Sequence, residues 1–137
     1  MRWQDFIDEK KVKKTNKDLS KTKSLVNMSD NLIKLFSKID IDESTSSAVF
    51  VNYYEALRQI VEAVATINGF KVYSHEALTS FLSEILKEDL ISNKFDRFRF
   101  LRNGVNYYGE QIEVELSKES KTDILNIIKI LKSKYLK

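Results

Sequence analysis

The sequence predicts an all-α protein: an up-and-down bundle of four to five long helices that forms a single domain over residues 1–137. Three observations support this fold class. The chain contains no proline and only three glycines, whereas average usage would give about seven prolines and about ten glycines. Leu, Ile, Lys and Glu are abundant. Apolar residues recur at spacings of three or four along most of the chain, which is the period of an amphipathic helix.

The N-terminal part is expected to contain one short helix and one long helix. Residues 1–17 are interpreted as a basic N-terminal arm or a short helix, with three apolar residues on one side: Trp3, Phe6 and Ile7. A long helix is expected over residues 18–39, where apolar residues follow the helical period. This long helix is the first of the expected bundle, which covers residues 18–136.

The strongest helical pattern in the chain lies between residues 45 and 67 and forms a continuous apolar stripe. Asn68 and Gly69 are expected to end this helix, because glycine readily adopts the left-handed conformation that follows a helix. A short connection over residues 70–74 leads to a third helix, for which Ser74 is a suitable N-cap.

The C-terminal part predicts two more helices. Ser92 and Asn93 are expected to begin the fourth, and Gly109 to end it. Residues 110–116 alternate between polar and apolar in the period of a strand. Since no second strand is recognisable as a partner, we interpret them as an extended linker. The last helix is expected to begin near Ser117.

Positive charge is concentrated near the N-terminus. Residues 10–23 contain seven lysines and one aspartate, a local charge of +6, so the other 123 residues sum to −3. Such a segment attracts nucleic acid or acidic lipid through its charge alone. The alternative is a solvated, lysine-rich surface without a partner.

Several classes of protein are excluded by composition. The absence of cysteine rules out disulfides, zinc fingers, iron–sulfur sites and thiol catalysis, and fits a reducing compartment. We find neither the apolar segment of a secretory signal nor 18 consecutive apolar residues, so a cytoplasmic protein without a membrane span is expected.

Metal and cofactor chemistry is not expected either. His75 is the only histidine, which excludes two-histidine zinc motifs and paired Glu-x-x-His di-iron sites. The glycines are isolated, so no phosphate-binding glycine loop is present. Glu84 and Glu88 are interpreted as a solvated helix edge. Two tyrosine pairs are expected to be core residues rather than stacking platforms; they are Tyr53-Tyr54 and Tyr107-Tyr108.

One segment, residues 94–109, has the composition of a binding site. Three of the five arginines lie within six residues: Arg97, Arg99 and Arg102. Arginine is suited to bidentate phosphate binding. Four side chains fan over roughly 140° of helix surface, enough to line one edge of a groove; they are Arg102, Asn103, Asn106 and Tyr107. Gly104 would cost about 1 kcal/mol in mid-helix, which is tolerable where another backbone comes close, for instance across a dimer interface. The alternative is a surface arginine cluster without a function.

The pattern Arg102-Asn103-x-x-x-Tyr107-Tyr108-Gly109, late in a bundle of long helices, resembles the HEPN superfamily, the higher-eukaryote and prokaryote nucleotide-binding domain. The hallmark of that family is Arg-x4–6-His, commonly with Asn, Asp or His directly after the arginine. Tyr107 occupies the position that the histidine has in the shorter spacing. The motif is similar to that of the branch of the family in which tyrosine replaces this histidine. Residues 52–58 and 74–78 also look like the second and third helices of small prokaryotic members.

The resemblance implies a homodimer in which two motifs face each other across a shared cleft. Many HEPN proteins are metal-independent ribonucleases, often toxins, and small members commonly pair with a minimal nucleotidyltransferase. Their arginine orients phosphate and their histidine is the base for attack by the 2′-hydroxyl. The resemblance thus implies catalytic positions at Arg102 and Tyr107, and RNA or nucleotide binding by Arg102, Asn103 and Tyr107. Arg99 and Asn106, from the same arginine-rich segment, complete the five expected binding residues.

The replacement of histidine by tyrosine divides the functional hypotheses. Tyrosine, with an ordinary pKa near 10, is a poor base at neutral pH, although its hydroxyl can donate to a phosphate oxygen. His75 could take the role of base only if the fold brought it to the cleft. The first hypothesis is therefore an RNA- or nucleotide-binding protein with at most weak ribonuclease activity. The second is an inactive dimer that acts as a protein-interaction subunit, and the third is an unrelated helical module in which residues 94–109 are ordinary core.

Overall fold

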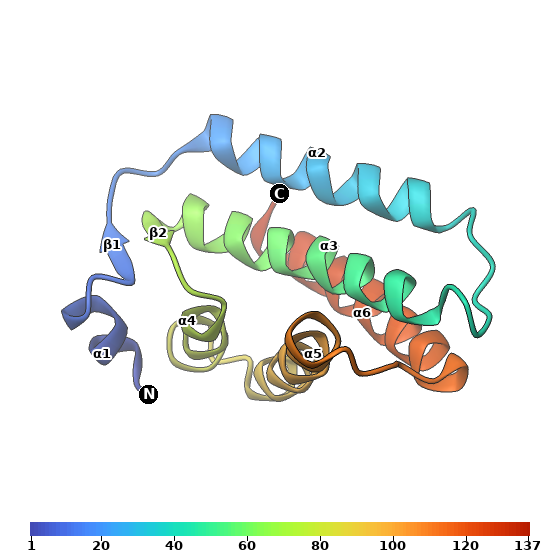
Figure 1. Ribbon diagram of the computed structural model, residues 1–137. Helices are drawn as coiled ribbons and strands as arrows, with labels where there is room; N and C mark the ends of the chain where they lie inside the picture. The colour runs from blue at the N-terminus through green and yellow to red at the C-terminus, as the bar shows by residue number, and fades with distance from the viewer.

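The computed structural model describes all residues, 1–137, and 72% of them are helical. The prediction of an all-α class is confirmed at this level, with one small two-stranded sheet added (Figure 1). The elements in chain order are α1 (Trp3–Asp8), β1 (Val12–Lys14), α2 (Leu19–Phe36), α3 (Ser46–Ile67), β2 (Phe70–Val72), α4 (His75–Ser80) continued by a π-helical turn (Phe81–Ile85), α5 (Asp89–Tyr108) and α6 (Val114–Tyr135). None of the helices combines the length and the apolar composition that a membrane crossing requires.

Helix α3 is the centre of the structure, with α2 along one side and α6 along another (Figure 1). Its apolar stripe is buried, as the helical period predicts; the members include Phe50, Tyr53, Tyr54, Leu57, Ile60, Val61 and Val64. The expected end is also confirmed, because Gly69 has a φ of +85°, a conformation that side chains with a Cβ disfavour. The interpretation of Tyr53 and Tyr54 as core residues is therefore confirmed.

The N-terminal segment forms the expected short helix, and its lysine-rich continuation forms a strand that the sequence did not predict. β1 pairs antiparallel with β2, with Val12 opposite Val72 and Lys13 opposite Lys71. The interpretation of residues 70–74 as a plain connection is therefore wrong. We call the two-stranded sheet of β1 and β2 the ribbon. It is held against the helices by Trp3, whose ring centroid lies 5.2 Å from that of Phe70. Strands of three residues are too short to show a period of two.

Two helix starts differ from the prediction. α5 begins at Asp89 rather than at Ser92, and α6 begins at Val114, so residues 114–116 are helical and only the start of the expected linker is extended. Ile112 and Leu116 alternate with polar residues, but their spacing of four also fits a helix. The expected end of α5 is confirmed by Gly109, which has a φ of +65°.

Glu84 and Glu88 make tertiary contacts, so their interpretation as a solvated helix edge is wrong. The backbone amide of Trp3 donates to Glu84 over 2.6 Å. The hydroxyl of Tyr135 donates to Glu88 over 3.0 Å. The two carboxylates thus tie the N-terminal and C-terminal segments to the turn between α4 and α5.

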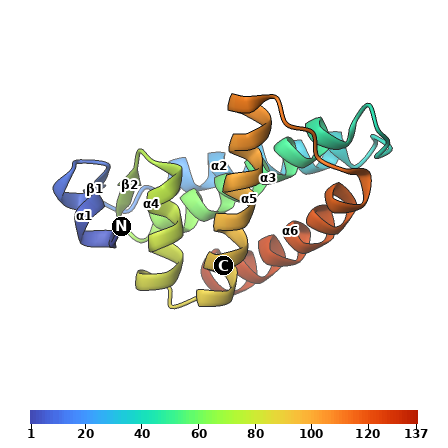
Figure 2. The same ribbon diagram turned by 60° about the horizontal axis from the view of Figure 1, so that its bottom comes forward.

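Helices α4 and α5 lie next to each other and run in opposite directions (Figure 2). The hydroxyl of Ser92 donates to the carbonyl of Thr79 over 2.8 Å, and the Thr79 hydroxyl donates to Asp96 over 3.2 Å. This arrangement brings the start of α4 beside the C-terminal half of α5, where the arginine segment lies.

Candidate functional site

A hollow of about 330 Å³ lies between the start of α4 and the C-terminal half of α5. We call it the α4–α5 hollow; its lining residues are Ser74, His75, Glu76, Arg99, Arg102, Asn103 and Tyr107. Four of the five predicted binding residues therefore lie together, whereas Asn106 is not part of the lining. The fold also brings His75 to the motif, which the sequence had left open. Ser74 and Glu76 were not foreseen as site residues, because nothing in the sequence indicates which helix faces α5.

Arg102 is the cation of the hollow that has no counter-ion. None of the salt bridges of the protein includes its half-buried guanidinium. Its Nη1 donates to Oδ1 of Asn103 over 3.2 Å, and its Cζ lies 5.7 Å from the ring centre of Tyr107. With the side-chain amide of Asn106 rotated by half a turn, the Oδ1 atom of Asn106 accepts a hydrogen bond from Nε of Arg102 over 3.0 Å. Neutral partners thus orient a guanidinium whose charge is unpaired.

Arg99 differs from Arg102 because a carboxylate neutralises it. Its Nε and Nη2 donate to Oδ1 of Asp96 over 3.1 and 2.9 Å, and its Cζ lies 4.9 Å from the ring centre of Phe100. A charge already paired has less to gain from a further anion. We therefore expect Arg99 to contribute less to anion binding than Arg102.

His75 is in contact with Tyr54 of α3. Its Nδ1 lies 3.1 Å from the hydroxyl of Tyr54, and the buried ring of Tyr54 stacks on Phe95. Burial lowers the pKa of His75, and the positive charges of Arg58 and Arg102 lower it further. Burial likewise raises the pKa of Tyr54. At neutral pH the histidine is therefore uncharged and the tyrosine keeps its proton.

Tyr107 and Tyr108 are exposed, so the prediction that they belong to the core is wrong. Their exposed fractions are 69% and 78%, and that of Phe100 is 65%. The last turns of α5 extend past the neighbouring α4 (Figure 2), so no helix covers these side chains. Three aromatic side chains consequently lie open near the hollow.

Gly104 is buried, and its close neighbour belongs to the same chain. A Cβ at this position would meet the carboxylate of Glu110, and the carbonyl of Gly104 accepts the amide of Glu110 over 3.1 Å. Glu110 is exposed and its carboxylate is the flexible end of a side chain that can move aside, so this contact does not by itself require a glycine at position 104.

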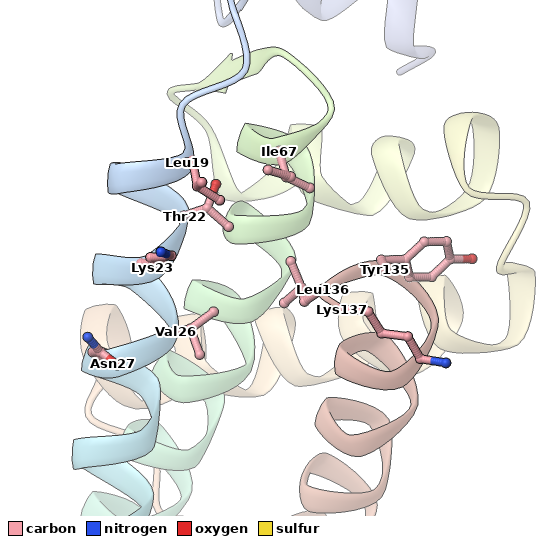
Figure 3. A pocket seen from close by; sticks show the side chains of 9 residues that line it. All are labelled: Leu19, Thr22, Lys23, Val26, Asn27, Ile67, Tyr135, Leu136 and Lys137. Carbon is pink, nitrogen blue, oxygen red and sulfur yellow. The ribbon is translucent and has the colours of Figure 1, made fainter.

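A second hollow, of about 310 Å³, lies between the start of α2, the end of α3 and the C-terminus (Figure 3). Its walls are mainly apolar and include Leu19, Val26, Ile67 and Leu136. It contains no histidine and no arginine. No cluster of three or more His, Asp or Glu side chains anywhere in the protein could hold a metal ion. The α4–α5 hollow is thus the better candidate for a site with chemistry.

The single histidine predicts a pH dependence of stability. Because the folded state lowers the pKa of His75, the unfolded chain binds more protons as the pH falls below about 6.5, the ordinary value. Stability should therefore be full above that pH and decrease between it and the lower folded pKa. Urea unfolding between pH 5 and 8 measures this, and His75→Gln should flatten the profile. Parallel profiles for the two proteins would contradict the expectation.

No family model, no curated protein and no solved structure matches this chain.

Proposed function

We propose that this protein is a HEPN-like RNA- or nucleotide-binding protein whose α4–α5 hollow binds a phosphate group. The observation that supports this most directly is the half-buried guanidinium of Arg102, which has no carboxylate partner. A partly buried charge without a counter-ion is costly, and binding an anion removes that cost. A phosphate presents oxygens that match the planar fork of a guanidinium.

The other lining groups suit the same ligand. The amide of Asn103 and the hydroxyl of Tyr107 can both donate to phosphate oxygens. Glu76 is the only carboxylate in the lining, and its side chain is exposed. The donors lie on α5, and the rest of the lining comes from the start of α4, which is fixed to α5 through Thr79, so the site is formed before a ligand arrives.

RNA is favoured over a free mononucleotide by what surrounds the hollow. The exposed rings of Phe100, Tyr107 and Tyr108 offer faces on which bases of a single strand can stack. Lys13 and Lys71 lie directly opposite each other on the ribbon and are both exposed. Like charges in such a pair destabilise a sheet, and neither lysine has an acidic partner among the salt bridges. A polyanion passing over the ribbon would offset this repulsion.

Binding is favoured over cleavage because Tyr107 is a poor general base. The family resemblance adds a homodimer, a cytoplasmic location and a minimal nucleotidyltransferase partner to the proposal, with a toxin-type or weak metal-independent ribonuclease as its enzymatic form. No metal or cofactor is part of it.

A matched pair of asparagine variants tests the proposal. We expect a labelled single-stranded RNA of about 12 nucleotides to bind the wild type by fluorescence anisotropy. Asn103→Ala should weaken binding by about twofold to about tenfold, the effect of one hydrogen bond. Asn93→Ala, an exposed residue of the same helix outside the hollow, should bind like the wild type. Absence of binding to both RNA and nucleoside 5′-phosphates would reject the proposal.

The ribbon lysines make a second measurable contribution. Each phosphate contact on a single strand contributes about 0.7 to the slope of log affinity against log salt. Replacing Lys13 and Lys71 by Gln should therefore reduce this slope by about 1.4 and stabilise the fold by a few tenths of a kcal/mol. Lys129→Gln with Lys137→Gln removes the same charge elsewhere and serves as the control. An equal slope change in both double variants would assign no specific role to the ribbon.

The alternative is a protein-interaction subunit, and the exposed aromatic side chains at the end of α5 are the observation that favours it. Phe100, Tyr107 and Tyr108 could pack against a second copy or another protein. In that case Arg102 would serve the interface rather than a ligand.

A further inference from the structure

The contact between Tyr54 and His75 determines where the proton of the histidine lies. Tyr54 has an exposed fraction of 0%, and the only hydrogen-bond partner of its hydroxyl is Nδ1 of His75, 3.1 Å away. Both groups can donate or accept, so the geometry alone permits two arrangements. They differ in whether a buried proton is left without an acceptor.

If Nδ1 donated to Tyr54, the hydroxyl proton of Tyr54 would have no acceptor inside the protein. An unpaired buried polar group is strongly disfavoured. If Tyr54 donates to Nδ1, both groups are satisfied. A neutral imidazole has one N–H, and with Nδ1 as the acceptor that hydrogen must be on Nε2.

Nε2 of His75 is the nitrogen that remains for a ligand. It makes no hydrogen bond within the protein, and it is not among the buried unpaired polar atoms, which are Oη of Tyr53 and Oε1 of Gln59. It is therefore accessible to solvent, on a residue that lines the hollow with Arg102.

We propose that Tyr54 holds His75 in the neutral Nε2–H form, so that His75 donates a hydrogen bond to the anionic oxygen bound by Arg102 and is not a general base. The nature of that oxygen, a phosphodiester oxygen of RNA, rests on the proposed function. The protonation form of His75 does not, because it follows from the contact with Tyr54 in the free protein.

The charges around His75 favour the neutral imidazole over the imidazolium. Arg58 with Glu55 and Glu62 faces it from α3, Arg99 and Arg102 face it from α5, and Glu76 follows it on α4. The two carboxylates on α3 are occupied by Arg58, with Glu55 at 2.6 Å and Glu62 at 2.5 Å. A second proton on the ring would have to reside on Nδ1 and oppose the hydroxyl hydrogen of Tyr54. The imidazolium is thus disfavoured by charge and by hydrogen bonding together.

The function of such a histidine is recognition. A neutral donor beside one guanidinium can bind a phosphodiester without taking up or releasing a proton, so affinity should not change between pH 7 and 8. Because the lone pair of the ring is engaged by Tyr54, His75 cannot accept the proton of a 2′-hydroxyl. It therefore does not replace the base that is absent at position 107.

The protonation form can be read directly, since the protein contains a single histidine. Long-range proton–nitrogen NMR of the 15N-labelled full chain at pH 7.5 should show Nδ1 unprotonated and Nε2 protonated. Tyr54→Phe, which keeps the ring, should shift both nitrogens towards a mixture of the two neutral forms. A protonated Nδ1 in the wild type would overturn the proposal. So would a spectrum of His75 that is the same in Tyr54→Phe.

Affinity for RNA separates a donor from a base or a cation. His75→Gln can place an amide N–H near the position of Nε2, so it should retain affinity to within about threefold, whereas His75→Ala should lose about tenfold. The probe is a single-stranded oligoribonucleotide without terminal phosphates, measured between pH 6 and 8. Equal losses in both variants, or wild-type affinity that falls tenfold per pH unit, would overturn the proposal. If no RNA binds at all, the proposed function fails, and the NMR result still decides the form of His75.

Discussion

Arg102→Ala is expected to weaken RNA or nucleotide binding by about tenfold to about 150-fold. The change removes a charge-assisted, bidentate contact that contributes about 1.5–3 kcal/mol. The guanidinium is free to make that contact because its partners in the protein are neutral: Asn103, Asn106 and the ring of Tyr107. Anisotropy titrations with a labelled single-stranded RNA measure the loss.

Arg97→Ala is the matched control, because Arg97 is exposed on the same helix and does not line the hollow. It removes the same charge and should weaken binding only through the general salt-dependent attraction. Sedimentation of both variants reports the oligomeric state. If Arg102→Ala dissociates a dimer and leaves the affinity of the monomer unchanged, Arg102 is an interface residue and the binding proposal is wrong.

Tyr107→His is expected to give the protein a ribonuclease activity that needs no metal ion. The substitution places an imidazole at the spacing from Arg102 that the family resemblance implies for the base. A positioned general base typically contributes a factor of about 100 to about 10,000 in rate. Tyr107 is exposed and makes no hydrogen bond within the protein, so the fold should tolerate the change. Cleavage of a labelled RNA in excess EDTA is the measurement.

Tyr108→His tests whether position matters, since Tyr108 is equally exposed but does not line the hollow. It should remain inactive, as should the double variant with Tyr107→His and Arg102→Ala. Equal activity of the two single histidine variants would indicate a nonspecific effect. An inert Tyr107→His that still binds RNA would show that the hollow lacks the geometry for cleavage.

The long helices could be predicted from the sequence, because a regular pattern of apolar residues that continues over many residues shows which side of a helix is buried. The stripe of α3 continues over six turns, and every helix packed against it had to present an apolar side. Gly69 and Gly109 marked the ends of α3 and α5, because their left-handed conformations are a local property of the backbone. The grouping of Arg99, Arg102, Asn103 and Tyr107 was also visible, since all four lie on one helix.

The features that the sequence did not predict depend on which segments meet. β1 and β2 are separated by more than fifty residues, and each is too short to show a strand period, so only their pairing defines them. Tyr107 and Tyr108 are large aromatic residues of a kind that is often buried in a core, but α5 extends beyond its neighbours and leaves them exposed.

The sequence by itself determined the helical class, the central helix and the arginine motif, because each depends on residues close together in the chain. Only the tertiary structure decided what surrounds the motif. The side-by-side, antiparallel packing of α4 and α5 brings His75 to Arg102. The contact with the buried Tyr54 of α3 determines which ring nitrogen of that histidine carries the proton. Such contacts join residues 21 and 27 positions apart, and their chemistry follows from burial and hydrogen-bond direction, which no local pattern of residues specifies.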